Sequence, residues 1–244
     1  MLKVELHAHS ADDPFDAIPH TTAQLIERAA SMGYQALAVT LHDKQLDLSS
    51  YRSLAAERGI TLIPGLERTI EGKHVLLLNF RRGAEDVSTF DDLAALKKHE
   101  AGLVIAPHPF FPGGTCLRGL MDRHANLFDA VEYNGMFTTW LNFNISAVRW
   151  AHVRGKPMVG CGDVHRLRQL GTTFSLVDAE PDADAICEAV RAGRVQVSAT
   201  PRSLGSAVAI MADLKVAEIL PPGFWQDTDT VPVPSLTVAR RSLR

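Results

Sequence analysis

Short apolar runs alternate along the chain with segments in which apolar residues recur at helical spacing. The apolar runs predict strands, and the segments with helical spacing predict helices. The predicted strands cover residues 4–9, 36–40, 61–64, 73–79, 103–106, 130–133, 157–161 and 173–177, and the predicted helices cover residues 22–31, 50–58, 91–100, 144–153 and 183–192. About seven consecutive β/α repeats favour an α/β fold with a closed, barrel-like parallel sheet, and a doubly wound open sheet is the alternative.

Five glycines support these boundaries, since each one lies just after a predicted helix. A glycine at such a point commonly ends a helix, because it adopts a left-handed conformation without steric strain. The five are Gly33, Gly59, Gly102, Gly155 and Gly193.

The composition changes after about Leu220. Few apolar runs follow, and prolines recur at Pro221, Pro222, Pro232 and Pro234. We therefore expect a barrel domain over residues 1–220 and a C-terminal extension over residues 221–244, either packed on the barrel or partly disordered.

The composition is that of a globular protein, since 46% of the 244 residues are hydrophobic. Lysine and arginine total 25 against 28 aspartates and glutamates, a net charge of -3, so any contact with nucleic acid must be local. No apolar run approaches the roughly 18 residues of a membrane span. Charges at Lys3 and Glu5 argue against a signal peptide. We therefore expect a cytoplasmic protein without a membrane partner, and nothing in the sequence predicts its oligomeric state.

The three cysteines, Cys116, Cys161 and Cys187, are an odd count at unrelated spacings. This pattern supports neither a disulfide framework nor a CxxC metal site. We expect buried, reduced thiols.

Histidines and carboxylates gather at the ends of the predicted strands. His7 and His9 close the first strand two residues apart, so both imidazoles lie on one face. Six further residues occupy strand ends: His42, Glu67, His74, His108, Asp163 and His165. The C-terminal ends of the strands build the active site of a β/α barrel. So many imidazoles and carboxylates in one apolar-walled mouth are unfavourable without a cation, and the pattern predicts a metal site.

The remaining histidines have a different setting. His20, His99, His124 and His152 lie in predicted helices or loops. We expect them to be solvated surface residues.

The segments that carry this chemistry resemble the motifs of the PHP superfamily, named for polymerase and histidinol phosphatase domains. They occur in the family's order over residues 4 to 178. The matching segments are LHAHS at 6–10, AVTLHD at 38–43, PGLE at 64–67, HVLL at 74–77, APHP at 106–109, VEYN at 131–134 and GDVHR at 162–166. The resemblance implies a distorted (β/α)7 barrel that holds two to three divalent metal ions at the C-terminal ends of its strands.

The resemblance also implies which residues bind each ion. The first ion has four ligands: His7, His9, Glu67 and Asp163. The second ion shares Glu67 and adds His74 and His108. The third ion takes His42, His165 and an acidic residue of the first loop.

The first loop departs from the family pattern. The usual HxHTxxSDG motif is replaced by a slightly longer loop over residues 9–16, so two assignments of its acidic ligand are open. Asp16 matches best, and Asp13 is the alternative. Leu41 stands where the family has an acidic residue or an asparagine. Glu132 and Asn134 fall on motif positions near the site, where they either take part in the chemistry or support the scaffold.

The implied ligands indicate a hydrolytic chemistry. Mixed imidazole and carboxylate ligands suit Mn, Zn or Fe. The implied catalytic residues are Glu67, Asp163 and His165, because two ions bridged by Glu67 hold a hydroxide that attacks phosphorus. Cationic side chains in or beside the strand-end loops are candidates for substrate binding: Lys44, Arg68, Arg118, Arg166 and Arg168.

The ligand set and the resemblance together favour a metal-dependent phosphoesterase. Its expected substrate is a phosphomonoester, a nucleotide-like phosphodiester or a short oligonucleotide. A hydroxide between two ions also attacks carbonyl carbon, so an amidohydrolase-like hydrolase of carbon–nitrogen or ester bonds is an alternative. A second alternative is a metal-binding module without catalytic activity, against which the nearly complete ligand set argues.

Overall fold

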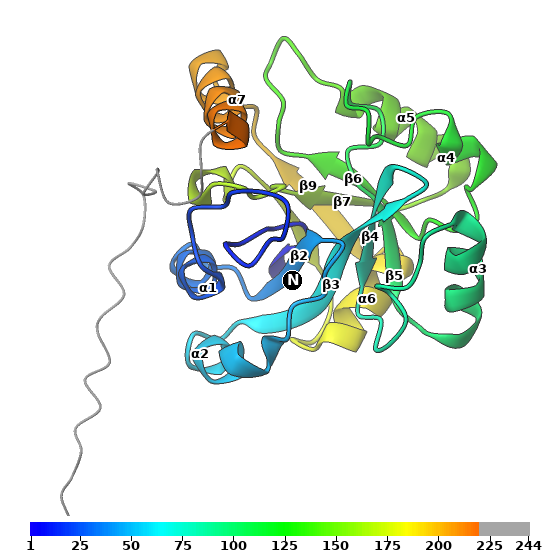
Figure 1. Ribbon diagram of the computed structural model, residues 1–244, viewed down its shortest axis with the longest axis horizontal. Coiled ribbons are helices and arrows are strands. Elements are labelled where there is room, and N and C mark those ends of the chain that lie inside the picture. The colour runs from blue at the N-terminus through cyan, green and yellow to red at the C-terminus, as the bar shows by residue number, and fades with distance from the viewer. Residues whose placement is uncertain (220–244) are drawn as a thin grey trace, which may run out of the picture.

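Residues 1–219 are described by a computed structural model, in which one sheet of nine strands curves around an axis and helices lie on its outside (Figure 1). The strands are β1 (Leu2–Glu5), β2 (Ala36–His42), β3 (Thr61–Ile70), β4 (Lys73–Leu78), β5 (Leu103–Ala106), β6 (Ala130–Asn134), β7 (Met158–Cys161), β8 (Thr173–Val177) and β9 (Val195–Ala199). The helices are α1 (Thr22–Ser31), α2 (Arg52–Glu57), α3 (Phe90–His99), α4 (Leu120–Arg123), α5 (Asn144–Arg154), α6 (Ala183–Arg191) and α7 (Leu204–Ile219), with 3-10 helices η1 (Leu48–Tyr51) and η2 (Leu167–Gln169). The predicted extension at 221–244 lies outside the described residues.

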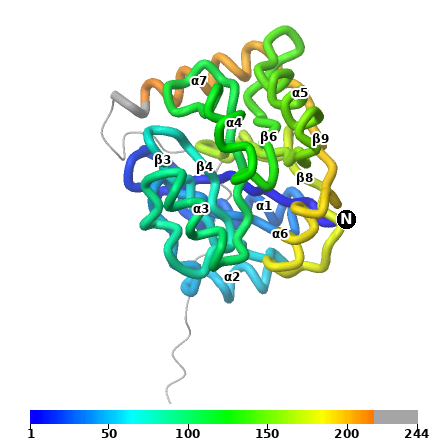
Figure 2. Tube along the Cα trace, turned by 90° about the vertical axis from the view of Figure 1, so that its right-hand side faces the viewer, coloured from blue at the N-terminus to red at the C-terminus, as the bar shows by residue number. Residues whose placement is uncertain are grey.

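The observed elements follow the predicted alternation. The helix at 22–31 and the strands at 103–106 and 173–177 have the predicted bounds. α4, β9 and α7 have no counterpart in the prediction. Seen from the side, α7 lies along the top of the molecule and α2 lies at its bottom (Figure 2).

The sheet is mixed, so the predicted all-parallel arrangement is wrong. The strand order is β7-β6-β5-β4-β3-β2-β1-β8-β9. β4 runs antiparallel to β3 and β5, and β8 runs antiparallel to β1 and β9. Glu71 and Gly72 alone connect β3 to β4, with φ of 49° and 75°. So short a turn joins only antiparallel strands.

The sheet nearly closes where β7 meets β8. Ser175 Oγ accepts a hydrogen bond from Gly160 N and donates one to Gly160 O, both at 3.0 Å. A Cβ atom on Gly160 would lie only 2.5 Å from Phe174 O, so this approach requires glycine. The predicted α/β barrel is therefore confirmed, and the alternative of an open doubly wound sheet is wrong.

Apolar side chains fill the barrel and close one of its ends. Inward-facing residues of the strands form a buried cluster with Ile186 and Val190 of α6. Thr61, where β3 begins, donates to the Pro181 carbonyl before α6, and Asn79, just after β4, donates to Asp184 of α6. α6 therefore covers the edge at which β3 begins, and the opposite edge is left for the polar residues.

β4 also explains the position of His74. Because β4 is antiparallel, it begins at the edge where β2 and β3 end, and His74 pairs with Thr69 near the end of β3. His74, at the start of β4, therefore lies at the same edge of the sheet as the residues at the ends of β2 and β3.

Two further expectations concern the described residues. All three cysteines are buried and free of disulfides, as predicted. Within residues 1–219, no helix is long and apolar enough to cross a membrane. The expected cytoplasmic location stays a prediction.

Candidate metal centre

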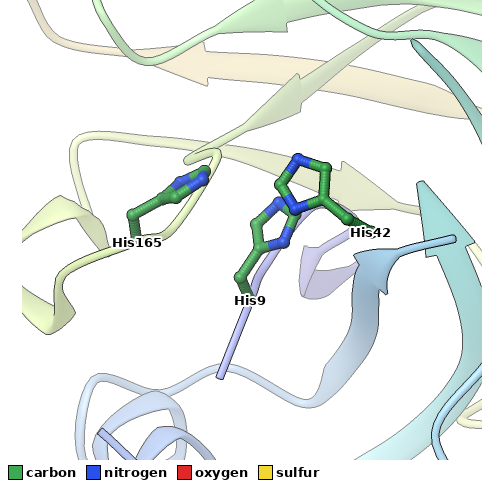
Figure 3. Close-up of side chains that lie close together, drawn as sticks. All are labelled: His9, His42 and His165. Carbon is green, nitrogen blue, oxygen red and sulfur yellow. The ribbon is translucent and has the colours of Figure 1, made fainter. Parts of the chain in front are cut away.

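Five imidazoles form a closed ring at the open edge of the barrel. Their neighbouring ring centroids lie 4.5 to 5.9 Å apart. In order around the ring they are His42, His9, His7, His108 and His74. A sixth imidazole, His165, lies with its centroid 4.3 Å from that of His9, and Figure 3 shows His9, His42 and His165 converging from separate segments.

The Glu67 carboxylate is the shared partner of this ring. Its oxygens lie 2.8 Å from His74 Nδ1 and 3.2 to 3.3 Å from the Nε2 atoms of the other four imidazoles. Glu67 is only 1% exposed. Burial acts to raise the pKa of Glu67, but the charges of His7 and His74 hold that pKa well below its ordinary value. The carboxylate is therefore ionised.

This arrangement fits divalent metal ions. A carboxylate offers about four acceptor positions, so it cannot accept hydrogen bonds from five imidazoles at once. His9 Nε2 is buried without a hydrogen-bond partner, although it lies 3.3 Å from Glu67 Oε2. A divalent ion satisfies both groups, since neutral imidazole and ionised carboxylate are its usual ligands.

Four groups of three residues within 1–219 place their ligand atoms within 4.8 Å of one another. They are His7, His9 and Glu67; His42, Glu67 and His74; His7, His108 and Asp163; and His9, His42 and His165. The structure thus brings together the eight strand-end residues that the sequence singled out. These groups do not match the three implied ligand sets one to one. His42 shares a group with Glu67 and His74, and His108 shares one with His7 and Asp163.

Glu132 orients His7 through the ring nitrogen that faces away from Glu67. Its Oε2 atom accepts from His7 Nδ1 at 3.0 Å and from the His108 amide at 3.2 Å, and its Oε1 atom accepts from Asn134 Nδ2 at 2.7 Å. A proton held on Nδ1 leaves Nε2 of His7 free to bind a metal. Asn134 also donates to Asp163 Oδ2 at 3.0 Å. Both residues act here through the ligands.

Asp13 has the same kind of role on the other side of the ring. Its Oδ2 atom accepts from Nδ1 of His9 and Nδ1 of His42, both at 3.0 Å, and its side chain has no exposed surface. Burial acts to raise the pKa of Asp13, but these hydrogen bonds hold it below its ordinary value. Asp13 therefore presents the Nε2 atoms of both histidines to the centre.

Asp16 faces the site more openly. Its Oδ2 atom lies 3.1 Å from His165 Nε2 and 3.9 Å from His42 Nδ1, and its side chain is 41% exposed. His165 Nδ1 donates a hydrogen bond to the Asp163 carbonyl oxygen at 3.2 Å, and its Nε2 atom faces Asp16. Of the two open assignments in the first loop, Asp16 is the one with a carboxylate beside His165.

Asp163 connects the two sides of the centre. Its Oδ1 atom lies 3.4 Å from both His7 Nε2 and His165 Nδ1. Burial acts to raise the pKa of Asp163, but the charges of His7 and His165 hold it below its ordinary value. Its φ of 50° is left-handed, an uncommon backbone conformation for a residue that is not glycine.

The cationic side chains have partners of their own. Arg68 donates to Asp43 and to the Val87 carbonyl, Arg118 donates to the Phe111 carbonyl, and Arg168 pairs with Asp213. Lys44 is exposed, with Nζ 3.4 Å from the Asp12 carbonyl. Arg166 is only 6% exposed and donates to the carbonyls of His165 and Asp213. Arg166 is therefore buried against backbone carbonyls and does not face solvent at the rim of the barrel.

Three residues near the site were not predicted to lie there. His20 is fully buried and donates from Nε2 to the His9 carbonyl at 2.9 Å, so its expected surface position is wrong. Cys116 Sγ lies 3.5 Å from His108 Nδ1. Glu5 is fully buried and accepts from the amides of Gly162 and His7. The sequence signal for Glu5 is a carboxylate within an apolar strand.

The comparisons with known proteins agree with this architecture. Residues 142–195 match the family model described as PHP-associated. The PolC-type DNA polymerase III of Staphylococcus epidermidis is 38% identical over 65 residues, which are 27% of this chain and 4% of the polymerase. The matched segment is thus a small part of that relative.

Solved structures share the fold at low identity. A two-domain protein from Bacteroides vulgatus, containing a predicted PHP-like metal-dependent phosphoesterase, has a TM-score of 0.62 at 19% identity, over 87% of this chain and 69% of its own. The lesion-specific endonuclease Q from Pyrococcus furiosus has a TM-score of 0.52 at 15% identity, over 86% of this chain and 66% of its own.

The family-model match and the shared fold confirm the predicted resemblance to the PHP superfamily. The chain has the fold of PHP-like metal-dependent phosphoesterases, and the histidine and carboxylate groups at one edge of its barrel are suited to binding metal.

Proposed function

We propose that this protein is a metal-dependent phosphoesterase that hydrolyses its substrate beside Glu67. The observation that carries the proposal is the ring of five imidazoles on one buried, ionised carboxylate. Such a set of neutral nitrogen and anionic oxygen ligands favours two or more divalent ions close together.

We assign two to three ions, with Mn, Zn or Fe as the candidates. His7, His9, Glu67 and Asp163 are the proposed ligands of the first ion. The second shares Glu67 and takes His74 and His108, and the third takes His42, His165 and Asp16. Bound divalent ions lower the pKa of water and polarise a phosphoryl group, which is the chemistry that phosphate ester hydrolysis needs.

The protein side chains prepare this chemistry by fixing protons. Glu132 holds the proton on Nδ1 of His7, and Asp13 holds the protons on Nδ1 of His9 and His42. When metal is bound, the Nε2 atoms of these histidines would then be free of protons and directed at the centre. We propose that Glu67, Asp163 and His165 are the catalytic residues, since all three contact the centre.

Lys44, Arg68, Arg118 and Arg166 are our candidates for binding the phosphate. Lys44 and Arg118 are exposed and are free to reorient toward a substrate. Arg166 is buried on the His165 carbonyl, so we assign it a positioning role.

The proposed substrates are phosphomonoesters and nucleotide-like phosphodiesters, including short oligonucleotides. The shared fold of endonuclease Q, whose complex with a 27-mer duplex substrate is known, supports including diesters of nucleic-acid type. A net charge of -3 favours small or short substrates, because the chain has no overall positive charge to attract a long polyanion.

The proposal is tested by loading the metal-free protein with Mn, Zn or Fe and assaying 4-nitrophenyl phosphate, bis(4-nitrophenyl) phosphate, a 4-nitroanilide and a 4-nitrophenyl ester. We expect hydrolysis of at least one phosphate ester. Glu67→Gln should lower kcat/KM more than about tenfold, a rise in the barrier above roughly 1.4 kcal/mol. The matched control is His99→Gln, because His99 is an exposed histidine on α3.

Two results would contradict the proposal. Hydrolysis of the anilide or carboxylate ester alone would favour the amidohydrolase-like alternative. Stoichiometric metal binding without any hydrolysis would favour a metal-binding module.

A further inference from the structure

Aromatic side chains flank the histidine ring at two separated points. The Phe15 ring meets His42 edge-on, with centroids 6.4 Å apart. The Phe111 ring meets His108 at the same centroid distance. His42 and His108 are not neighbours in the histidine ring, since His74 lies between them. The two phenylalanines therefore stand at different sides of the mouth.

Phe15 is held in place by the site itself. The amides of Phe15 and Asp16 donate to Asp13 Oδ1 at 2.9 and 3.0 Å, and the other oxygen of Asp13 binds His9 and His42. The turn that aims Asp16 at His165 therefore projects the ring of Phe15 outward, where the residue is 69% exposed. An apolar ring kept in water next to a polar centre suggests a role in contacting a ligand.

Phe111 is held by an equally local set of contacts. Its amide donates to the His108 carbonyl at 3.1 Å, and its carbonyl accepts from Nε and Nη2 of Arg118 at 3.2 and 3.1 Å. The Phe143 ring lies 5.3 Å from the Phe111 ring, centroid to centroid. Phe111 and Phe143, both only partly buried, form an aromatic pair on the side of His108.

We propose that these two aromatic sites bind planar rings on the two sides of a phosphodiester, one ring at Phe15 and the other at Phe111 with Phe143. The proposal rests on the proposed phosphoesterase function and specifies its substrate class. A monoester has one organic substituent and occupies one site only, whereas the two substituents of a diester leave phosphorus in different directions. Stacking on aromatic side chains needs no broad basic surface, in keeping with the net charge of -3.

The test compares dithymidine phosphate with two analogues in which one base is removed and the sugar and phosphate are kept. The metal-loaded protein should cleave the intact dinucleotide with a kcat/KM higher by roughly 5-fold to 100-fold than either analogue, the range expected for one stacked base. The charge and the scissile bond are the same in all three, so the comparison isolates the rings.

Single variants connect each ring to its site. Phe15→Ala should cleave the intact dinucleotide and one of the two analogues with the same kcat/KM. Phe111→Ala should do so for the other analogue. Phe15→Leu keeps an apolar side chain without an aromatic face and should recover only part of the effect. Trp140→Ala is the matched control, because Trp140 is an aromatic residue that is 92% exposed, on the loop between β6 and α5.

A binding measurement separates this proposal from the proposed function. A dithymidine analogue with CH2 in place of both bridging oxygens has no P–O–C bond to hydrolyse. Calorimetry should show that it binds more weakly to Phe15→Ala and Phe111→Ala, with unchanged thermal unfolding. Equal cleavage of all three dinucleotides, or unchanged discrimination in both variants, would overturn the proposal while leaving a phosphoesterase. Normal ring-dependent binding of the analogue without hydrolysis of any phosphate ester would overturn the proposed function and support the aromatic sites.

Discussion

At the scale of single residues, four buried or half-buried carboxylates of the centre differ in role because their neighbours differ. Glu67 meets five imidazoles directly, whereas Asp13 and Glu132 accept hydrogen bonds from the Nδ1 atoms of histidines. Asp16 is half-exposed beside His165. The direction in which each carboxylate points and its exposure therefore distinguish a proposed metal ligand from a residue that orients a ligand.

This difference gives a prediction for the first loop. Asp16→Asn should lower the metal content of the loaded protein by one ion and reduce activity, because only the proposed third ion loses a charged ligand. Asp13→Asn should affect more than one ion, since Asp13 orients both His9 and His42. Elemental analysis and phosphoesterase assays measure both variants, with the exposed Asp86→Asn as control. Full metal content and activity in Asp16→Asn would make the centre dinuclear.

A second prediction concerns the stability of the metal-free protein as a function of pH. Burial acts to lower the pKa of His42, but hydrogen bonding to Asp13 and the charge of Glu67 raise it from 6.5 to about 9. Burial raises the pKa of Glu5 from 4.5 to about 8. In both cases the folded state binds more protons than the unfolded state between the two values, so stability falls as pH rises through this window.

We therefore expect the thermal unfolding midpoint of the chelator-treated protein to fall between pH 6.5 and 9. His9 acts in the opposite sense below pH 6.5, outside this window, because burial lowers its pKa from its ordinary value of 6.5. The metal-loaded protein should keep its unfolding midpoint near pH 9, since the ions bind neutral imidazoles. Glu5→Gln should flatten the lower part of the profile. A metal-free profile that rises toward pH 9 would show that the protonated histidines do not stabilise the fold.

At the scale of elements, Gly102 shows a glycine used for packing. The sequence predicts that Gly102 ends a helix, yet α3 ends at His99 and the next residue, Glu100, is already extended with a φ of -128°. A Cβ atom on Gly102 would lie 2.2 Å from the fully buried Phe80 ring. The missing side chain therefore lets Phe80 close the junction between α3 and β5.

Gly102→Ala should destabilise the protein by about 1–3 kcal/mol, the usual range for overpacking a core. Chemical denaturation monitored by circular dichroism measures the loss. Gly119→Ala is the control, because no atom lies within 4 Å of the added Cβ and its φ is -64°. Equal stability of the two variants would mean that Phe80 moves aside without strain.

At the scale of the whole molecule, the seam between β7 and β8 keeps the centre together. Asp163 and His165 follow β7, whereas His7 and His9 follow β1, which pairs with β8. The two hydrogen bonds of Ser175 to Gly160 join these halves of the sheet. Backbone hydrogen bonds of Val164 to His7 and His9, at 3.1 and 3.0 Å, join the same two segments directly, so the seam supports the distance from Asp163 to His7 together with them.

Ser175→Ala removes both bonds at a fully buried position, which should lower the free energy of unfolding by about 1–3 kcal/mol. Metal affinity should fall with it, since the two halves of the ligand set are then less firmly joined. Denaturation and metal titration measure the two effects. Ser53→Ala on the exposed face of α2 should change neither. A destabilised variant with unchanged metal affinity would show that the seam does not support the centre.

The sequence by itself determined the order of the elements and the residues that meet at the open edge. Both follow from local rules: apolar periodicity defines strands and helices, and a polar residue at a strand end such as His42 or His108 is carried to the edge of the sheet. The strand-end residues of the proposed centre were accessible for this reason, except His74, which reaches this edge because β4 is antiparallel.

Only the tertiary structure decided the antiparallel strands, the burial of His20 and Arg166, and the separate positions of Asp13 and Asp16. Side chains in loops and on reversed strands are directed by hydrogen-bond partners distant in sequence, such as His42 for Asp13 and His165 for Asp16. Periodicity describes only near neighbours along the chain, so these contacts became visible when the barrel brought the strand ends together.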